Sequence, residues 1–277
     1  MTRIPIYEAE NNRLNRSLLE HLRYASCYLA FFLFWTRRSI TTRYSQTSVG
    51  LLWALLQPML SSLVYIIVFS LVIRISTDPV PYPLFVFVSI VMWSYFNRIV
   101  FSGAAAITSN LDIVTRVQFP REFLILSVWV ESIVDLLIGL SIAAILCLLY
   151  RYPLPATLPL ALFVFVIHTI FSLALAFIIS ALNSRVRDFM QLLPILLQLL
   201  FYLSPVLYPL DLVPEAVQGF YFINPLGPIF AAYQETILFG RFTLLVPLLV
   251  IGVFSCVLLV AGYKLFKRME WNFVDLL

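Results

Sequence analysis

The sequence has little charge: Asp, Glu, Lys and Arg make up 12% of its 277 residues, whereas hydrophobic residues make up 62%. This scarcity of charge excludes a soluble globular protein, because a soluble core cannot absorb so much apolar surface. The mean hydropathy is +0.97, and charge-free runs reach the ~20 residues that a helix needs to cross a hydrocarbon layer of ~30 Å. The composition therefore predicts an integral membrane protein.

Cysteine and histidine are also scarce, with three cysteines and two histidines. Cys27, Cys147 and Cys256 lie in apolar surroundings without metal-ligand spacing, and their odd number argues against a disulfide framework. His21 and His168 have no Cys or carboxylate neighbours at ligand spacing, so no metal site is expected. The N-terminal residues lack a short apolar core followed by a cleavage site, so we expect no removable signal peptide.

Long charge-free stretches divide the chain into membrane spans. They cover residues 44–73, 79–97, 136–150, 152–184, 189–210 and 242–263, and the third span begins earlier, near Phe123. A further stretch, 216–234, is interrupted by Gly219, by Asn224-Pro225 and by Gly227-Pro228, which break helices. The pattern predicts an all-α protein with six spans and, before the last span, a re-entrant pair of short helices.

The basic residues predict the orientation of these spans, because cytoplasmic loops retain the excess of Lys and Arg. Of the 18 Lys and Arg residues, only Arg74, Arg151 and Arg241 fall on one side of the six-span arrangement. The other side is therefore cytosolic and holds both termini. A full crossing by 216–234 would move the basic C-terminus outside, which supports the re-entrant interpretation.

The segment 24–35 is apolar between Arg23 and Arg37-Arg38. Its twelve residues rise only ~18 Å as a helix, too short to cross, and basic flanks suit anionic lipid headgroups. We expect an amphipathic helix along the cytosolic surface, within a cytosolic N-terminal part (1–43) that precedes a six-span domain (44–277). The alternative is a plain membrane anchor without further function.

The stretch TRVQFPREFL at 115–124 lies in the longest cytosolic loop, at about 103–121. A helix that begins after Asn110 or Asp112 and is stopped by Pro120 would expose Asp112, Arg116 and Arg121 to a soluble partner. The alternative is a solvated turn whose arginines only follow the charge rule.

Two acids lie inside the third span. Glu131 and Asp135 are four residues apart and share one helix face. An unpaired acid at the bilayer centre costs ~2.5–3.5 kcal/mol, so both should face protein or water, with Arg98 as the counter-ion of Glu131. An interhelical contact is favoured over substrate contact for this polar group. For His168, a hydrogen-bonded packing role is favoured over a proton relay.

Five short stretches, at 43–58, 119–122 (FPRE), 183–189 (NSRVRDF), 204–215 and 223–240, occur in one order along the chain. Together they resemble the permease subunit of ABC-type polysaccharide exporters, and they are more similar to the O-antigen and teichoic acid branch than to the capsule branch. The resemblance covers nearly the whole chain beyond about residue 17.

The resemblance implies a homodimer whose subunits each bind a cytosolic nucleotide-binding ATPase subunit. It implies a coupling helix in the loop after the second span, an N-terminal helix at the membrane interface and an outer gate of re-entrant helices at about 211–241. The sequence has no G-x-x-x-x-G-K-[ST] loop, so this chain is expected to be no enzyme, and ATP and Mg²⁺ are expected on the partner subunit. The residues that match the coupling positions are Asp112, Arg116, Phe119, Arg121, Arg185, Arg187 and Asp188.

The resemblance also implies that spans one and five line the conduit for the glycan. Aromatic rings stack on the C–H faces of sugars, although Trp and Tyr also gather at membrane interfaces for other reasons. The conduit candidates are Trp53, Tyr65, Phe69, Phe201, Tyr202 and Tyr208, and the outer-gate candidates are Phe220, Tyr221, Phe222, Asn224 and Pro225. Arg37, Arg38 and Arg43 are candidates for the lipid phosphate at its point of access, or serve topology alone.

These features predict an ATP-driven exporter in the cell inner membrane that moves a lipid-linked polysaccharide outward. Its expected partners are a second copy, two ATPase subunits, the lipid-linked glycan and membrane lipids, without nucleic acid. A secondary transporter or channel-type flippase is one alternative, but only one broken region is present where two matching ones are expected. An intramembrane glycan-modifying enzyme is the other, and Glu131 with Asp135 would be its only close acidic pair within a span.

Overall fold

The computed structural model describes residues 28–45, 50, 52–72, 77–186, 188–214, 219, 221 and 223–270. Regular structure in these residues is helical, as the sequence predicts. The α-helices are α2 (Leu29–Ser45), α3 (Leu52–Ile66), α4 (Tyr82–Ala105), α5 (Leu111–Arg116), α6 (Glu122–Leu149), α7 (Ala161–Arg185), α8 (Phe189–Leu203), α10 (Leu226–Tyr233) and α11 (Leu245–Met269). Two π-helical segments, Ile67–Val72 and Gln234–Phe239, continue α3 and α10.

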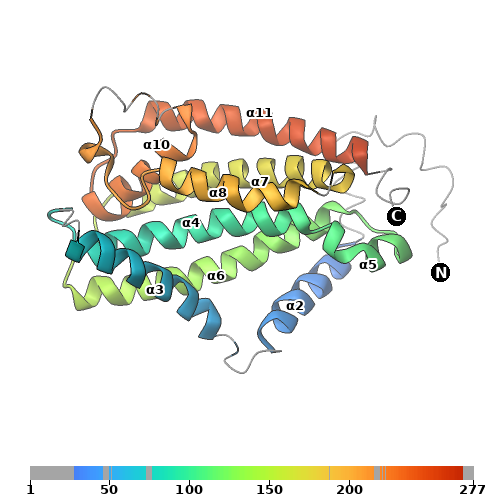
Figure 1. Ribbon diagram of the computed structural model, residues 1–277, viewed down its shortest axis with the longest axis horizontal. Coiled ribbons are helices and arrows are strands. Elements are labelled where there is room, and N and C mark those ends of the chain that lie inside the picture. The colour runs from blue at the N-terminus through green and yellow to red at the C-terminus, as the bar shows by residue number, and fades with distance from the viewer. Residues whose placement is uncertain are drawn as a thin grey trace.

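The long helices form a bundle around α4. Figure 1 shows α4, α6, α7, α8 and α11 running along the long axis, with α2 and α3 oblique to them on one side. Helix α4 contacts α3, α6, α7 and α8, and α11 packs along α7. Helix α5, the start of α2 and the end of α11 lie at one end of the bundle, whereas α10 lies at the other. The chain thus has two structurally distinct ends.

Small residues permit close helix crossings, as is usual when helices pack within a membrane. A Cβ added to Gly139 of α6 would lie 2.7 Å from Val91 Cγ1 of α4. At the crossing of α11 with α7, a Cβ on Gly262 would lie 2.8 Å from Ile178 Cγ1. These distances are shorter than van der Waals contact, so a larger residue at either crossing would force its neighbour to shift.

Four helical segments among the described residues are long and apolar enough to cross a membrane: Tyr82–Ala105, Glu122–Leu149, Leu158–Arg185 and Leu245–Met269. The chain is therefore a multi-pass membrane protein. The expected first and fifth spans contain shorter apolar helices, Leu55–Ser70 and Phe189–Leu203. Helix α8 ends at Leu203, because Ser204 precedes Pro205 and adopts the extended conformation that a following proline favours. Six spans stay a prediction.

Helix α2 is longer than the twelve-residue apolar segment and continues through Arg37, Arg38 and Arg43. It packs along the first half of α6. The Phe31 and Phe119 rings are 4.6 Å apart, and the Thr36 and Ser127 hydroxyl oxygens are 2.9 Å apart. This contact gives α2 a defined path on the bundle, while its position at the membrane surface stays a prediction.

Only the second half of the expected re-entrant pair is described as a helix of its own. Helix α10 begins after Pro225, and its π-helical continuation ends at Gly240, whose φ of 68° is left-handed and favours glycine. The first half of the expected pair includes residues 215–218, 220 and 222, which lie outside the described residues. The re-entrant pair is therefore still a prediction.

Candidate functional site

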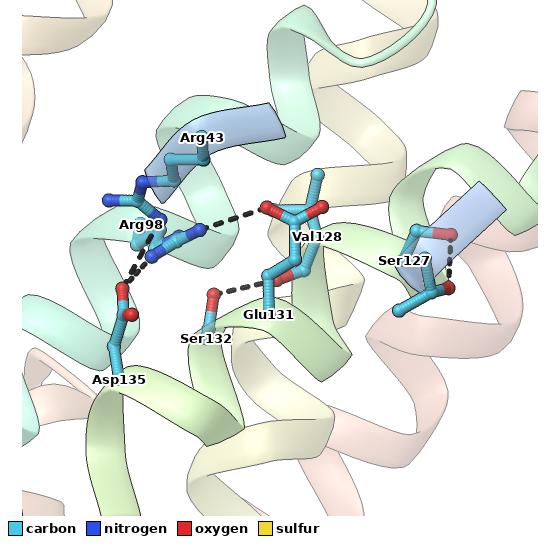
Figure 2. Close-up of polar contacts among 8 residues, drawn as sticks. Arg43, Arg98, Ser127, Val128, Glu131, Ser132 and Asp135 are labelled. Atoms are coloured by element: carbon cyan, nitrogen blue, oxygen red, sulfur yellow. Dashed lines mark hydrogen bonds and ion pairs between the residues drawn. The ribbon is translucent and has the colours of Figure 1, made fainter. Parts of the chain in front are cut away.

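A network of four charged side chains joins three helices inside the bundle (Figure 2). Arg98 of α4 donates from Nη2 to Glu131 Oε2 of α6 at 2.9 Å and also pairs with Asp135. The Arg98 and Glu131 side chains are only 13% and 10% exposed. The structure thus brings together the two residues that were expected to pair. It adds Arg43 of α2, whose Nη1 lies 3.3 Å from Asp135 Oδ2.

A polar recess of about 560 Å³ lies beside this network. Its walls come from α3, α4 and α6, and Arg43 of α2 closes one side. The lining includes Arg43, Trp53, Gln57, Ser94, Asn97, Arg98, Phe101, Ser132 and Asp135. The recess was not evident from the sequence, because its lining residues are scattered over nearly a hundred positions.

The expected conduit aromatics separate into two places. Tyr65 and Phe201 bring α3 and α8 together with ring centroids 5.4 Å apart, and Phe69 and Tyr202 adjoin this pair. Trp53 lies twelve residues before Tyr65 on α3, about 18 Å along a helix, and instead lines the polar recess. Phe201 is buried against Trp93, so it serves packing within this subunit.

The coupling candidates on the long loop after α4 differ in exposure. Helix α5 begins after Asn110, as expected, and ends at Arg116, before Pro120. Asp112 and Arg116 are exposed on it. Phe119 and Arg121 differ from the expectation: Phe119 is buried under Phe31 of α2, and Arg121 is half-buried and donates to the Glu270 carbonyl oxygen.

The segment after this loop is bonded to the end of α11. Lys267 Nζ lies 2.5 Å from Glu122 Oε2 and 3.0 Å from Glu270 Oε2. The Tyr263 hydroxyl also donates to Glu122 Oε1 at 3.3 Å. These contacts, here called the α6–α11 clamp, join residues about 145 positions apart in the chain, which is why no local pattern indicated them. The clamp links α11 to the same loop that carries α5.

The second loop that was expected to be cytosolic lies beside the first. Arg185 ends α7 and Asp188 precedes α8, and both side chains are exposed. Arg187 lies outside the described residues. Asn183, which the sequence did not single out, donates to the Ala104 carbonyl at 3.1 Å and to the Thr108 hydroxyl at 3.2 Å. The two loops therefore share a hydrogen-bonded base.

The three arginines that are candidates for binding the lipid phosphate, Arg37, Arg38 and Arg43, do not form one cluster. Arg37 and Arg38 are exposed on α2, and the Arg38 guanidinium lies 5.6 Å from the centroid of the Trp35 ring. Arg43 is bonded to Asp135 deeper in the bundle. Of the three, Arg37 and Arg38 are the better placed for a phosphate, because the charge of Arg43 is already balanced.

His168 is fully buried among aromatic rings. Its Nδ1 is 3.3 Å from the Tyr233 hydroxyl of α10, and the rings of Tyr95, Phe96 and Phe230 surround it. These contacts favour the packing role over the relay and place His168 where α7 holds α10.

Asn224 organises the start of α10. Its Nδ2 donates to Ser204 Oγ at 3.0 Å, and its Oδ1 accepts the Leu226 amide at 3.1 Å. Pro225 follows in helical conformation, and Tyr221 bonds to the Tyr208 hydroxyl at 2.7 Å. Phe220 and Phe222, the remaining outer-gate candidates, lie outside the described residues.

Replacing Asn224 by alanine is expected to loosen the start of α10, because it removes the cap on Leu226 and the bond to Ser204. Loss of a helix cap costs about 1 kcal/mol, roughly a fivefold change in an opening equilibrium. Hydrogen exchange of the amides in α10 should therefore accelerate about fivefold. Asn224→Asp is the control, since its carboxylate still accepts from Leu226. Unchanged exchange in the alanine variant would contradict this role.

Comparison with known proteins supplies the family. Residues 30–238 match the ABC-2 type transporter family. The chain is 32% identical over 254 residues to an O-antigen export system permease protein, RfbA, of Myxococcus xanthus, covering 90% of this chain and 95% of that protein. It is 26% identical to an RfbA of Klebsiella pneumoniae, covering 87% and 93%, and 22% identical to a polysialic acid transport protein, KpsM, of Escherichia coli, covering 84% and 91%.

These matches confirm the resemblance that the five short stretches indicated. The higher identity to the O-antigen permeases than to the polysialic acid protein agrees with the expected branch. A helical bundle with several apolar helices of spanning length and a matching family over residues 30–238 together identify the chain as a member of the ABC-2 type transporter family.

Proposed function

We propose that this chain is the permease subunit of an ATP-driven exporter that moves a lipid-linked polysaccharide of O-antigen or teichoic acid type to the outer side of the cell membrane. The observation that carries this proposal is the 32% identity, over 90% of the chain, to an O-antigen export permease. The permease binds no ATP itself, and ATP with Mg²⁺ is bound by the cytosolic partner.

The proposed assembly contains two copies of the chain and two ATPase subunits. Helix α8 supports a dimer contact, because it buries Leu193 and Leu197 within the subunit but exposes large apolar side chains elsewhere. The exposed ones are Leu192, Ile195, Leu196, Leu199, Tyr202 and Leu203. In this arrangement α3 and α8 of both copies border the conduit, and α10 closes its outer end.

The proposed topology has six spans with both termini in the cytosol and α2 at the cytosolic surface. Asp112 and Arg116 of α5, with Arg185, Arg187 and Asp188 on the second loop, contact the ATPase subunit. Arg121 transmits the motion through its bond to the end of α11 rather than touching the partner. The exposure of α5 and the α6–α11 clamp support this division.

Co-purification tests the proposal. An ATPase subunit from the same cells should copurify with the tagged full-length chain from membranes, and deletion of the gene should trap lipid-linked glycan inside the cell. Purified chain that moves or alters glycan without a nucleotide-hydrolysing partner would contradict the proposal and favour a secondary transporter or an enzyme.

A further inference from the structure

The residues that line the polar recess have no role in the proposed ATPase coupling and are separate from the Tyr65–Phe201 aromatic pair. Its volume of about 560 Å³ falls within the ~300–1,000 Å³ of sites that bind small molecules. It lies in the half of the bundle nearer α5, since Arg98 is seven residues before the end of α4, or about 10 Å along the helix. A ligand that binds at this depth would enter the recess from the membrane or from the membrane surface.

The charges at the recess balance one another. Arg98 is paired with Glu131 and Asp135, and Arg43 with Asp135. Two guanidinium groups therefore face two carboxylates. This balance disfavours a phosphate, which needs uncompensated cations, and favours a ligand without net charge.

The remaining lining combines aromatic faces with neutral hydrogen-bonding groups. The Trp53 side chain is 47% exposed and, with Phe101, presents apolar surface to the recess. Gln57 and Asn97 present amides, and within the part of the chain that the structure describes neither amide bonds to protein. Hydrocarbon cannot form hydrogen bonds with these amides, so a lipid chain would bind poorly in the recess.

We propose that the recess binds an uncharged sugar ring of the lipid-linked glycan. This inference rests on the proposed function and names the part of the substrate that the recess holds. The ring stacks its C–H face on Trp53, and its hydroxyls bond to Gln57, Asn97 and the neighbouring serines. The lipid phosphate lies outside the recess, toward the exposed Arg37 and Arg38 of α2.

Photo-crosslinking tests this proposal directly. A photoreactive amino acid replaces Phe101 in the full-length chain, assembled with its ATPase subunit in membrane vesicles. The probes are the lipid-linked glycan from the producing cells and the same lipid phosphate without sugar. The control position is Leu137 of α6, which is 59% exposed and outside the recess lining. We expect at least fivefold more glycan at position 101 than at 137, and little capture of the sugar-free lipid.

Equal capture at both positions would overturn the proposal, and so would equal capture of the sugar-free lipid, which would make the recess a lipid cleft. The double variant Gln57→Leu, Asn97→Leu in the position-101 background should reduce glycan capture about fivefold, while retention of the ATPase subunit reports its folding. Undiminished capture by this folded variant would also overturn the proposal. If the unaltered chain retains the ATPase subunit but position 101 captures no glycan, only this inference fails; if no ATPase subunit is retained, the proposed function fails.

Discussion

Replacement of Arg98 by leucine is expected to lower the amount of folded protein in the membrane at least tenfold. The change leaves Glu131 inside the bundle without its closest counter-ion and removes one of the two arginines that pair with Asp135. Loss of one partner of a buried pair costs about 3–5 kcal/mol. Each 1.4 kcal/mol is a factor of ten, so the expected cost exceeds the tenfold loss. Detergent-extracted protein that elutes as a single species measures the folded amount.

Two controls separate charge balance from packing. Arg98→Leu combined with Glu131→Gln removes the unpaired carboxylate, keeps the Arg43–Asp135 pair, and should restore much of the yield. Arg241→Leu breaks the Arg241–Asp211 pair, whose side chains are 47% and 69% exposed, and should change the yield less than twofold because exposed pairs contribute little. A normal yield and normal export in Arg98→Leu would show that the pairing has no structural importance.

Reversal of both charges on α5, Asp112→Arg with Arg116→Glu, is expected to reduce ATP-driven export at least tenfold while the chain still folds. Both side chains are exposed, so the bundle does not need them. Placing like charges against each other at an interface costs several kcal/mol, so the ATPase subunit should bind weakly. Retention of the ATPase subunit and glycan at the cell surface are the two measurements.

The matched control reverses two charges at the same end of the bundle but on another helix. Lys264 and Arg268 are exposed in the last turns of α11, and Lys264→Glu with Arg268→Glu should leave export within about twofold of normal. If the α5 variant retains its ATPase subunit and exports normally, α5 is not the coupling element. If both variants fail equally, docking depends on the charges at this whole end of the bundle and not on α5 in particular.

Local rules predicted those features of the fold that depend on a single helix. The start of α5 after Asn110 was predicted from the capping preference of asparagine, although the Asn110 side chain donates to the Ala106 carbonyl and forms no cap bond. The pairing of Arg98 with Glu131 follows from the scarcity of partners within a membrane. The membership in a transporter family could be predicted as well, because several short stretches occur in matching order.

Features that depend on how helices cross could not be predicted. Arg43 reaches Asp135 because α2 packs on α6 through Phe32 and Thr36, a contact between positions about 90 apart. Trp53 was grouped with Tyr65 because both lie on one helix, but the rise between them places Trp53 in the polar recess. The charge-free stretch 189–210 also overstated the length of α8, because the helix ends at Leu203, before Ser204-Pro205.

The α6–α11 clamp bears on how the protein should be handled in the laboratory. Lys267, in the last turn of α11, forms ion pairs with Glu122 and with Glu270. These pairs lie next to the loop that carries α5. A bulky fluorescent protein fused behind this helix would crowd the surface that we propose binds the ATPase subunit. A small epitope spliced into the loop near Arg151, at the opposite end of the bundle, would let the complex be captured and imaged with the proposed docking face unobstructed.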